Sequence, residues 1–135
     1  MLELDTNAHS VYLLHYHIVL VTKYRRQVID KAVSERLRKV FEHISPTYKI
    51  SIQAWNHEKD HIQVLFKAQP KTEISKFINA YKSASSRLIK KEFPEIRKKL
   101  WKEYFWSRSF CLLTSGGAPL EVIKKYIEKQ GGSDE

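Results

Sequence analysis

Six histidines carry the most versatile chemistry in this chain of 135 residues, because a neutral imidazole can act as a base or as a metal ligand. Alternate residues of a strand share one face, and two segments would pair candidate ligands in this way: His15-Tyr16-His17 and His61-Ile62-Gln63. His61 follows the polar stretch 56–60, so we expect it near a strand end, where functional side chains are exposed on a rigid support. His15 and His17 could bind the same metal, or could satisfy each other within a buried strand.

A second candidate pair, Tyr126 and Gln130, is four residues apart and therefore neighbours on one face of a helix. At 100° per residue, Leu120, Ile123 and Ile127 form the apolar stripe of that helix, and the pair lies along its margin. A side chain at this margin can reach into a cleft between helix and sheet. A tyrosine there can also simply pack, with its hydroxyl in water.

Basic residues predict a polyanionic partner. Twenty-four Lys and Arg against fifteen Asp and Glu give a formal net charge of +9, which favours nucleic acid. The candidate DNA-binding residues are Lys23, Arg25, Arg26, Lys82, Ser83, Ser86, Arg87, Lys90 and Lys91. Three of them, Lys82, Ser86 and Lys90, share a helix face and could follow phosphates, although a solvated charged face is the alternative. Tyr104 and Trp106 are candidates for stacking on an unpaired base, and Trp101 for the core or a dimer contact.

Hydrophobic patterning predicts the elements that would position these residues. The apolar run 11–22 predicts a long strand buried on both faces, and the stripe over 33–44 predicts a helix. Segments 48–54 and 62–68 read as two strands of a hairpin, with a turn at 56–60. A long helix should begin at Thr72 as N-cap and end at Phe93-Pro94. The last part of 100–114 predicts a fourth strand, and 119–130 a final helix that Gly131-Gly132 would stop.

This order predicts an α+β fold: a ferredoxin-like βαββαβ antiparallel sheet with helices on one face, and an additional C-terminal helix that carries Tyr126. We expect a single domain over residues 1–135, with 1–9 and 131–135 as flexible tails. One cysteine, no signal peptide and an apolar run too short for a membrane span predict a cytoplasmic protein with no membrane partner.

Several segments carry a resemblance to a known family. They are Tyr16-His17-Ile18-Val19 running into Thr22-Lys23-Tyr24-Arg25-Arg26, then Asp60-His61-Ile62-Gln63-Val64-Leu65, Lys82-Ser83-Ala84-Ser85-Ser86-Arg87, Leu100-Trp101, Phe105-Trp106 and Tyr126-Ile127-Glu128-Lys129-Gln130. In this order and spacing they resemble the small single-tyrosine HUH transposases of insertion sequences, the TnpA type, named for a His-hydrophobic-His motif. The resemblance spans about Ser10 to Gln130.

The resemblance implies a homodimer with shared active sites that binds a hairpin in single-stranded DNA and cleaves one strand beside it. Tyr126 would attack the phosphodiester, leaving a 5′-phosphotyrosine and a free 3′-hydroxyl that can later rejoin the strand. His61, Gln63 and Gln130 would hold Mg²⁺ or Mn²⁺, which must polarise the phosphate because a phenol with a pKa of about 10 is a poor nucleophile.

The sequence departs from the family motif at position 63, where Gln stands in place of the second His. An amide oxygen suits Mg²⁺ or Mn²⁺ but is a weaker donor than imidazole. Gln63 could be a working ligand, the protein could be a weakened or domesticated relative that binds hairpins without cutting, or His15 or His17 could supply the missing nitrogen. An RNA-binding ferredoxin-like domain is disfavoured, because the basic-Gly-aromatic pattern of such domains is absent.

Overall fold

The computed structural model of the protein describes residues 13–114 and 120–132. Its helices and strands are β1 (Leu14–Val21), η1 (Lys23–Arg25), α1 (Lys31–Ile44), η2 (Ser45–Tyr48), β2 (Ser51–Glu58), β3 (His61–Ala68), α2 (Ile74–Glu92), α3 (Pro94–Arg97), η3 (Trp101–Glu103), β4 (Cys111–Thr114) and α4 (Leu120–Gly132), where η marks a short 3-10 helix.

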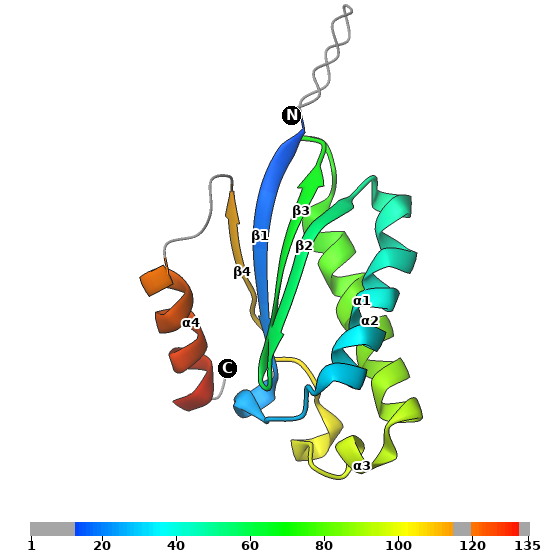
Figure 1. Ribbon diagram of the computed structural model, residues 1–135, viewed down its shortest axis with the longest axis vertical. Helices are drawn as coiled ribbons and strands as arrows, with labels where there is room; N and C mark the ends of the chain where they lie inside the picture. Colours follow the sequence, from blue (N-terminus) through cyan, green and yellow to red (C-terminus); the bar gives the residue numbers. More distant parts are fainter. Residues whose placement is uncertain (1–12, 115–119, 133–135) are drawn as a thin grey trace, which may run out of the picture.

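The four strands form one antiparallel sheet in the order β2-β3-β1-β4, with β1 and β3 at its centre (Figure 1). This order is the ferredoxin-like one that the sequence predicted. Because successive residues of a strand point to opposite faces, Ile18 and Leu20 enter the main core under α1 and α2. Val19 and Val21 point to the opposite face, where they pack against α4. The sheet is therefore covered on both faces at this end.

Strand β1 is buried on both faces only over its second half, whereas the sequence predicted this for the whole run 11–22. Residues Ile18 to Val21 are buried, while His15 and His17 are half-buried. Residues 11 and 12 lie outside the described residues. Helix α4 contacts the half of β1 that ends in Val21. This is why only that half of β1 is buried on both faces.

The hairpin turn is shorter than the polar composition of 56–60 predicted. Strand β2 continues to Glu58, and only Lys59 and Asp60 connect it to β3. Asn56 and Glu58 are polar because β2 is an edge strand with one face in solvent, a pattern that resembles a turn in sequence. Thr72 was also misassigned: its hydroxyl donates to the Tyr48 carbonyl, and α2 begins at Ile74 without a side-chain cap.

The segment between α3 and β4 is held to the sheet and to α2 through Trp106. The backbone of 105–107 continues the pairing with β1: Lys23 N–H donates to the Phe105 carbonyl at 2.9 Å and Ser107 N–H to the Val21 carbonyl at 2.8 Å. The buried Trp106 indole donates to Ser85 Oγ on α2 at 2.9 Å. These bonds place a chain without regular structure between the end of β1 and the long helix.

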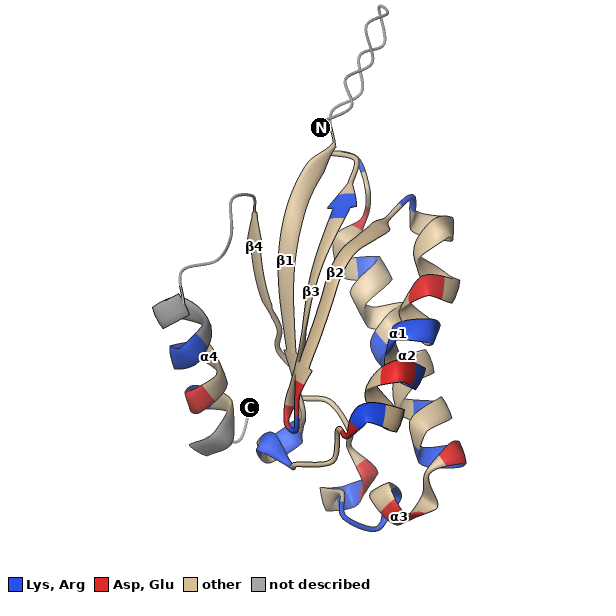
Figure 2. Cartoon of the chain, in the orientation of Figure 1, with Lys and Arg blue, Asp and Glu red and all other residues tan. Residues whose placement is uncertain are grey.

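Charge is distributed unevenly over the fold. Figure 2 shows Lys and Arg gathered on the helices and at the η1 end of the sheet, while most of each strand is uncharged. Among the described residues, no helix is both long and apolar enough to cross a membrane.

Candidate active site and nucleic-acid interface

His61 and Gln63 open β3 and lie on the sheet face that α4 covers. His61 pairs in register with Val21, and Gln63 with Val19, the two valines that carry α4. The Gln63 amide nitrogen lies 3.2 Å from His61 Nε2. A half-turn of the Gln63 amide would exchange its nitrogen and oxygen and bring the oxygen towards His61 Nε2. Which of the two atoms faces His61 depends on the hydrogen-bonding partners that are present. The two side chains predicted as ligands therefore converge.

Asp60 fixes the ring of His61. Its Oδ1 lies 2.8 Å from His61 Nδ1 and its Oδ2 lies 2.8 Å from Arg25 Nε, and both Asp60 and His61 are buried. With Nδ1 bonded to a carboxylate, the lone pair of His61 is on Nε2 and faces Gln63. The hydrogen bond from His61, followed by that from Arg25, lowers the pKa of Asp60 to about 2 against the cost of burial.

Tyr24 and Arg25 have positive φ angles of 56° and 55°, the left-handed region that a side chain disfavours. Such strain persists only where the surroundings determine the conformation, and is frequent at functional sites. Here it turns Arg25 onto Asp60, so η1 is built into the support of His61.

Helix α4 brings Tyr126 and Gln130 to the same face of the sheet. Tyr126 is half-buried against the Val19 and Val21 pair, and Gln130 is only 4% exposed. The exposed residues of this part of α4 are Lys124, Lys125, Glu128 and Lys129. Two serines meet the pair: Ser107 Oγ donates to Gln130 Oε1 at 2.7 Å, and Ser109 Oγ lies 2.9 Å from the Tyr126 hydroxyl.

Val21 is the common neighbour of these groups. It pairs with His61 on one side, its carbonyl accepts the Ser107 amide on the other, and its side chain supports α4. Neighbouring strands lie about 4.8 Å apart, so the backbones of His61 and Ser107 are roughly 10 Å apart across Val21. The structure thus gathers the four predicted catalytic and metal-binding residues around the end of β1.

His15 and His17 share this sheet face but lie too far along β1 to complete the site. His17 pairs with Leu65 and His15 with Lys67, four and six residues from Val21, the partner of His61. At about 3.3 Å per residue these offsets are roughly 13 Å and 20 Å, well beyond hydrogen-bonding distance. The hypothesis that one of them supplies the nitrogen missing at position 63 is therefore wrong for this chain.

The remaining donors are one imidazole and two amides. Among residues 13–114 and 120–132 no group of three or more His, Cys, Asp or Glu could hold a metal ion. His61 Nε2 with the amide oxygens of Gln63 and Gln130 is a neutral donor set of one borderline nitrogen and two hard oxygens, which Mg²⁺ and Mn²⁺ can accept. Asp60 is hydrogen-bonded to Nδ1 of His61, the ring nitrogen that would not bind the metal, as carboxylates often are in metal-binding histidines. These residues fit a hard divalent cation.

The basic residues after β1 differ in accessibility. Arg26 is exposed and Arg25 is half-buried in its ion pair with Asp60. Lys23 is only 7% exposed, and its Nζ lies over the rings of Tyr24 and Tyr104. A phosphate would have to displace that aromatic cover to reach Lys23, whereas Arg26 is accessible as the fold stands.

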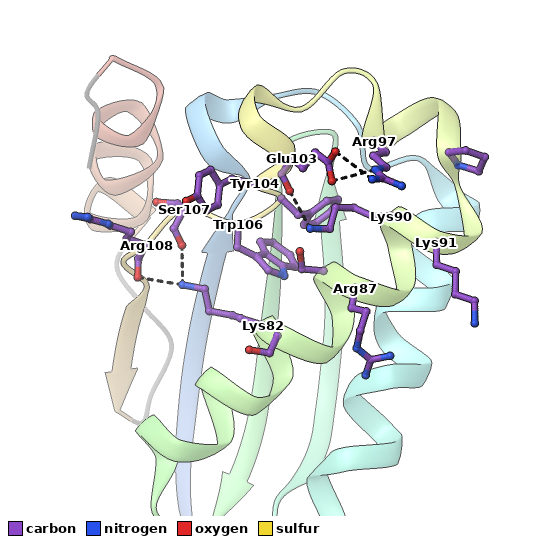
Figure 3. Close-up of a pocket in the computed structure, with 14 residues that line it drawn as sticks. Lys82, Arg87, Lys90, Lys91, Arg97, Glu103, Tyr104, Trp106, Ser107 and Arg108 are labelled. Atoms are coloured by element: carbon purple, nitrogen blue, oxygen red, sulfur yellow. Dashed lines mark hydrogen bonds and ion pairs between the residues drawn. The ribbon is translucent and has the colours of Figure 1, made fainter.

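A basic groove of about 820 Å³ runs between α2 and the segment 97–108 (Figure 3). Lys82, Ser86 and Lys90, which helical spacing put on one face, all line it, and so does Arg87. Lys91, a further candidate from the sequence, also lines it, whereas the sequence did not identify Arg97 and Arg108. Glu103, the single acid among the residues that line it, is paired with Arg97. The groove is therefore strongly positive.

The aromatic residues near the groove divide into a buried and an exposed group. Trp106 is buried, so it is not available to stack on a base. Tyr104 is 55% exposed and Trp101 is 42% exposed, and their rings stack with centroids 6.0 Å apart. Trp101 therefore lies outside the core. Tyr104 lines the groove and Trp101 does not, and a lysine Nζ lies over each ring, that of Lys23 over Tyr104 and that of Lys102 over Trp101.

Sequence reasoning missed the two serines that contact α4. Their only signal was position: they follow the Phe105-Trp106 segment, and nothing in their residue type distinguishes them from other surface serines. Asp60 was visible as the neighbour of His61, but successive residues of a strand point to opposite faces, so adjacency alone did not predict the 2.8 Å contact.

Comparison with known proteins finds relatives that are all transposases. Residues 10–130 match the family described as "Transposase IS200 like". The chain is 33% identical over 129 residues to the ISDra2 transposase TnpA of Deinococcus radiodurans, covering 96% of this chain and 92% of that protein. It is 32% identical over 127 residues to the transposase for insertion sequence element IS200 of Salmonella typhimurium, covering 91% and 80%.

Solved structures agree with the sequence relatives. A crystal structure from Deinococcus radiodurans, of a protein assigned as a transposase, matches with a TM-score of 0.84 and 30% identity, covering 96% of this chain and 99% of that one. A REP-associated tyrosine transposase bound to a REP hairpin shares the fold, with a TM-score of 0.58 and 11% identity, covering 84% and 62%. The family resemblance drawn from the sequence is confirmed.

Proposed function

Because this chain belongs to the IS200-like transposase family, we propose that it cleaves and rejoins single-stranded DNA at the ends of an insertion sequence, with Tyr126 as the nucleophile. The observation that carries the proposal is the convergence of Tyr126, Gln130 and His61 around Val21, on one face of the sheet. A tyrosine that only packed would need neither a buried amide one turn away nor an oriented imidazole on the neighbouring strand.

In the proposed reaction the Tyr126 oxygen forms a bond to phosphorus while the bond from phosphorus to the 3′ oxygen breaks. The phenol releases its proton to water and the 3′ oxygen takes one up, which leaves a 5′-phosphotyrosine and a free 3′-hydroxyl. Attack by a 3′-hydroxyl on the phosphotyrosine rejoins a strand and releases Tyr126. The covalent intermediate conserves the phosphodiester bond, so rejoining needs no nucleotide hydrolysis.

His61, Gln63 and Gln130 would hold Mg²⁺ or Mn²⁺ in this reaction. When bound, the ion polarises a phosphate oxygen and stabilises the charge that develops at phosphorus. The contribution of the chain is orientation: Asp60 directs the lone pair of His61, and Ser107 fixes the Gln130 amide while leaving its oxygen a second lone pair. All three ligands are neutral, so the charge of the ion would be balanced largely by the DNA phosphate.

For the substrate we propose single-stranded DNA that carries a hairpin, bound by the basic groove beside α2. Support comes from the six cations of the groove, Lys82, Arg87, Lys90, Lys91, Arg97 and Arg108. Phosphate contacts of this kind supply affinity, and the exposed Tyr104 and Trp101 rings could take an unpaired base. The structural relative with a TM-score of 0.58 was solved bound to a REP hairpin, which supports the same class of ligand. We further propose a homodimer with shared active sites.

The test is the formation of a covalent adduct. Single-stranded oligonucleotides containing hairpins from the DNA that flanks this coding sequence are incubated with the protein and Mn²⁺, then separated on a denaturing gel. A 3′ label should migrate with the protein, because a 5′-phosphotyrosine links Tyr126 to the fragment that retains the 3′ end. A 5′ label should appear on a free oligonucleotide. Tyr126→Phe should abolish the adduct, and an adduct that survives this substitution would overturn the assignment.

The Gln at position 63 favours one alternative, a relative that binds hairpins without cleaving them. Wild-type protein that retains hairpin binding but forms no adduct with Mg²⁺ or Mn²⁺, while Gln63→His does form one, would establish this alternative.

A further inference from the structure

The segment Ser107 to Ser109 lies between the basic groove and α4, and α2 holds its backbone. Lys82 Nζ donates to the carbonyl of Ser107 at 2.6 Å and to that of Arg108 at 3.1 Å (Figure 3). On the sheet side, the Ser107 amide donates to Val21, and Ser107 is fully buried. The segment is therefore anchored to two elements before it reaches α4.

The hydroxyls of this segment meet α4 at two points. Ser107 contacts Gln130 at 2.7 Å and Ser109 contacts Tyr126 at 2.9 Å. Four residues of helix rise about 6 Å, and two residues of chain span at most about 7 Å, so the two spacings match. Two bonds a helical turn apart fix both the height and the rotation of α4, which a single bond would not.

In the part of α4 whose side chains are described, the apolar packing is provided by Tyr126 and Ile127, which lie against Val19 and Val21 of β1. The helix also contacts η1. Apolar contact is non-directional, so it permits sliding and rotation that would move a hydroxyl by more than an angstrom. Directional bonds are what can hold the Tyr126 oxygen in a geometry fit for attack.

We propose that Ser109 and Ser107 are positioning residues for the strand-transfer reaction, Ser109 for the Tyr126 hydroxyl and Ser107 for the Gln130 amide. This inference rests on the proposed function. The Ser109 hydroxyl can accept the phenol hydrogen before attack and donate to the same oxygen as negative charge develops. Ser107 acts through the amide it orients, as outer-sphere partners of metal ligands do.

The test for Ser109 uses single-turnover adduct formation on the 3′-labelled hairpin oligonucleotide with Mn²⁺. Ser109→Ala should slow the adduct rate about tenfold and move its rise with pH to higher pH, while hairpin affinity and thermal unfolding stay unchanged. Ser109→Thr keeps a hydroxyl and should restore most of the rate. Ser75→Ala, an exposed serine on α2 outside the groove lining, is the matched control.

The test for Ser107 is metal affinity measured without catalysis, by titrating the protein with Mn²⁺. Ser107→Ala should weaken Mn²⁺ binding by about tenfold, the lower end of the usual effect of outer-sphere partners. Because Ser107 is buried, Ser107→Thr is a second variant, and it should bind Mn²⁺ more tightly than Ser107→Ala.

The outcomes separate this inference from the proposed function. Wild-type protein that forms no adduct would overturn the proposed function, and with it this inference. An adduct in wild type with an unchanged rate and pH profile in Ser109→Ala would overturn only the positioning role of Ser109. Equal losses in Ser109→Ala and Ser109→Thr, accompanied by lowered thermal stability, would assign Ser109 a merely structural role and also overturn it.

Discussion

Asp60 is a buried carboxylate with both oxygens engaged, one by His61 and the other by Arg25. Its pKa is lowered to about 2, so its stabilisation of the fold is complete above about pH 4 and is lost as the pH falls towards 2. The shift corresponds to about 2 kcal/mol. Urea unfolding between pH 2 and 7 in EDTA should show this loss in wild type and not in Asp60→Asn. Glu35→Gln, an exposed carboxamide substitution on α1, should keep the wild-type profile; an unchanged profile in Asp60→Asn would contradict the prediction.

Gln63 is the residue at which the site departs from the His-hydrophobic-His motif. If its amide is a ligand, Gln63→His should bind Mn²⁺ more tightly by roughly tenfold, because imidazole is the stronger donor. Calorimetric titration without DNA measures this affinity. Gln53→His, which places the same side chain at an exposed position of β2, should leave it unchanged. Equal affinities in Gln63→His and wild type would exclude position 63 from the metal site.

The sequence located residues well where one element places two of them together. Strand periodicity put His61 and Gln63 on one face, and helix periodicity put Tyr126 beside Gln130; both placements agree with the structure. It could not locate Ser107 and Ser109, because their contacts join distant segments of the chain and depend on how α4 lies on the sheet. Contacts between distant segments produce no periodic pattern in the sequence.

At the scale of elements, patterning predicted the sheet, both long helices and their order, because each buries one apolar face against the same core. The predicted ends of helices and strands were wrong where a polar residue had a role other than the turn or helix cap that its type suggests. Glu58 lies on the solvent face of an edge strand, and Thr72 bonds to the Tyr48 carbonyl instead of capping α2. The segment 100–110 could not be predicted, because Trp106 orders it through a bond to Ser85 on another element.

For the whole molecule, the net charge of +9 matters where it is concentrated, in the groove beside α2. Each phosphate neutralised by a cation releases counterions, so removing one contact should weaken hairpin DNA binding and reduce the salt slope by about 1. Fluorescence anisotropy with a labelled hairpin at several KCl concentrations should show this for Arg87→Ala. Lys76→Ala lies on the same helix outside the groove lining and should behave as wild type. Equal slopes in both variants would place the DNA elsewhere.

In the proposed homodimer, the assembly would determine which chain supplies Tyr126 to which site. Helix α4 is the last of the described elements, and exchanging it between two identical copies would preserve its contacts with Val19, Val21 and Ser107. Shared active sites therefore predict complementation between two inactive variants, Tyr126→Phe and His61→Ala. After equal mixing and subunit exchange, half of the dimers contain both variants, and one of their two sites combines an intact His61 with an intact Tyr126.

The mixture should thus form adduct at up to about a quarter of the wild-type level, while each variant alone forms none. The 3′-labelled hairpin oligonucleotide with Mn²⁺ measures this directly. A mixture of Tyr126→Phe with Tyr126→Phe/His61→Ala is the matched control, since it contains no intact tyrosine in any arrangement. An inactive mixture of the two single variants, with subunit exchange verified by mass, would mean that each α4 serves the sheet of its own chain.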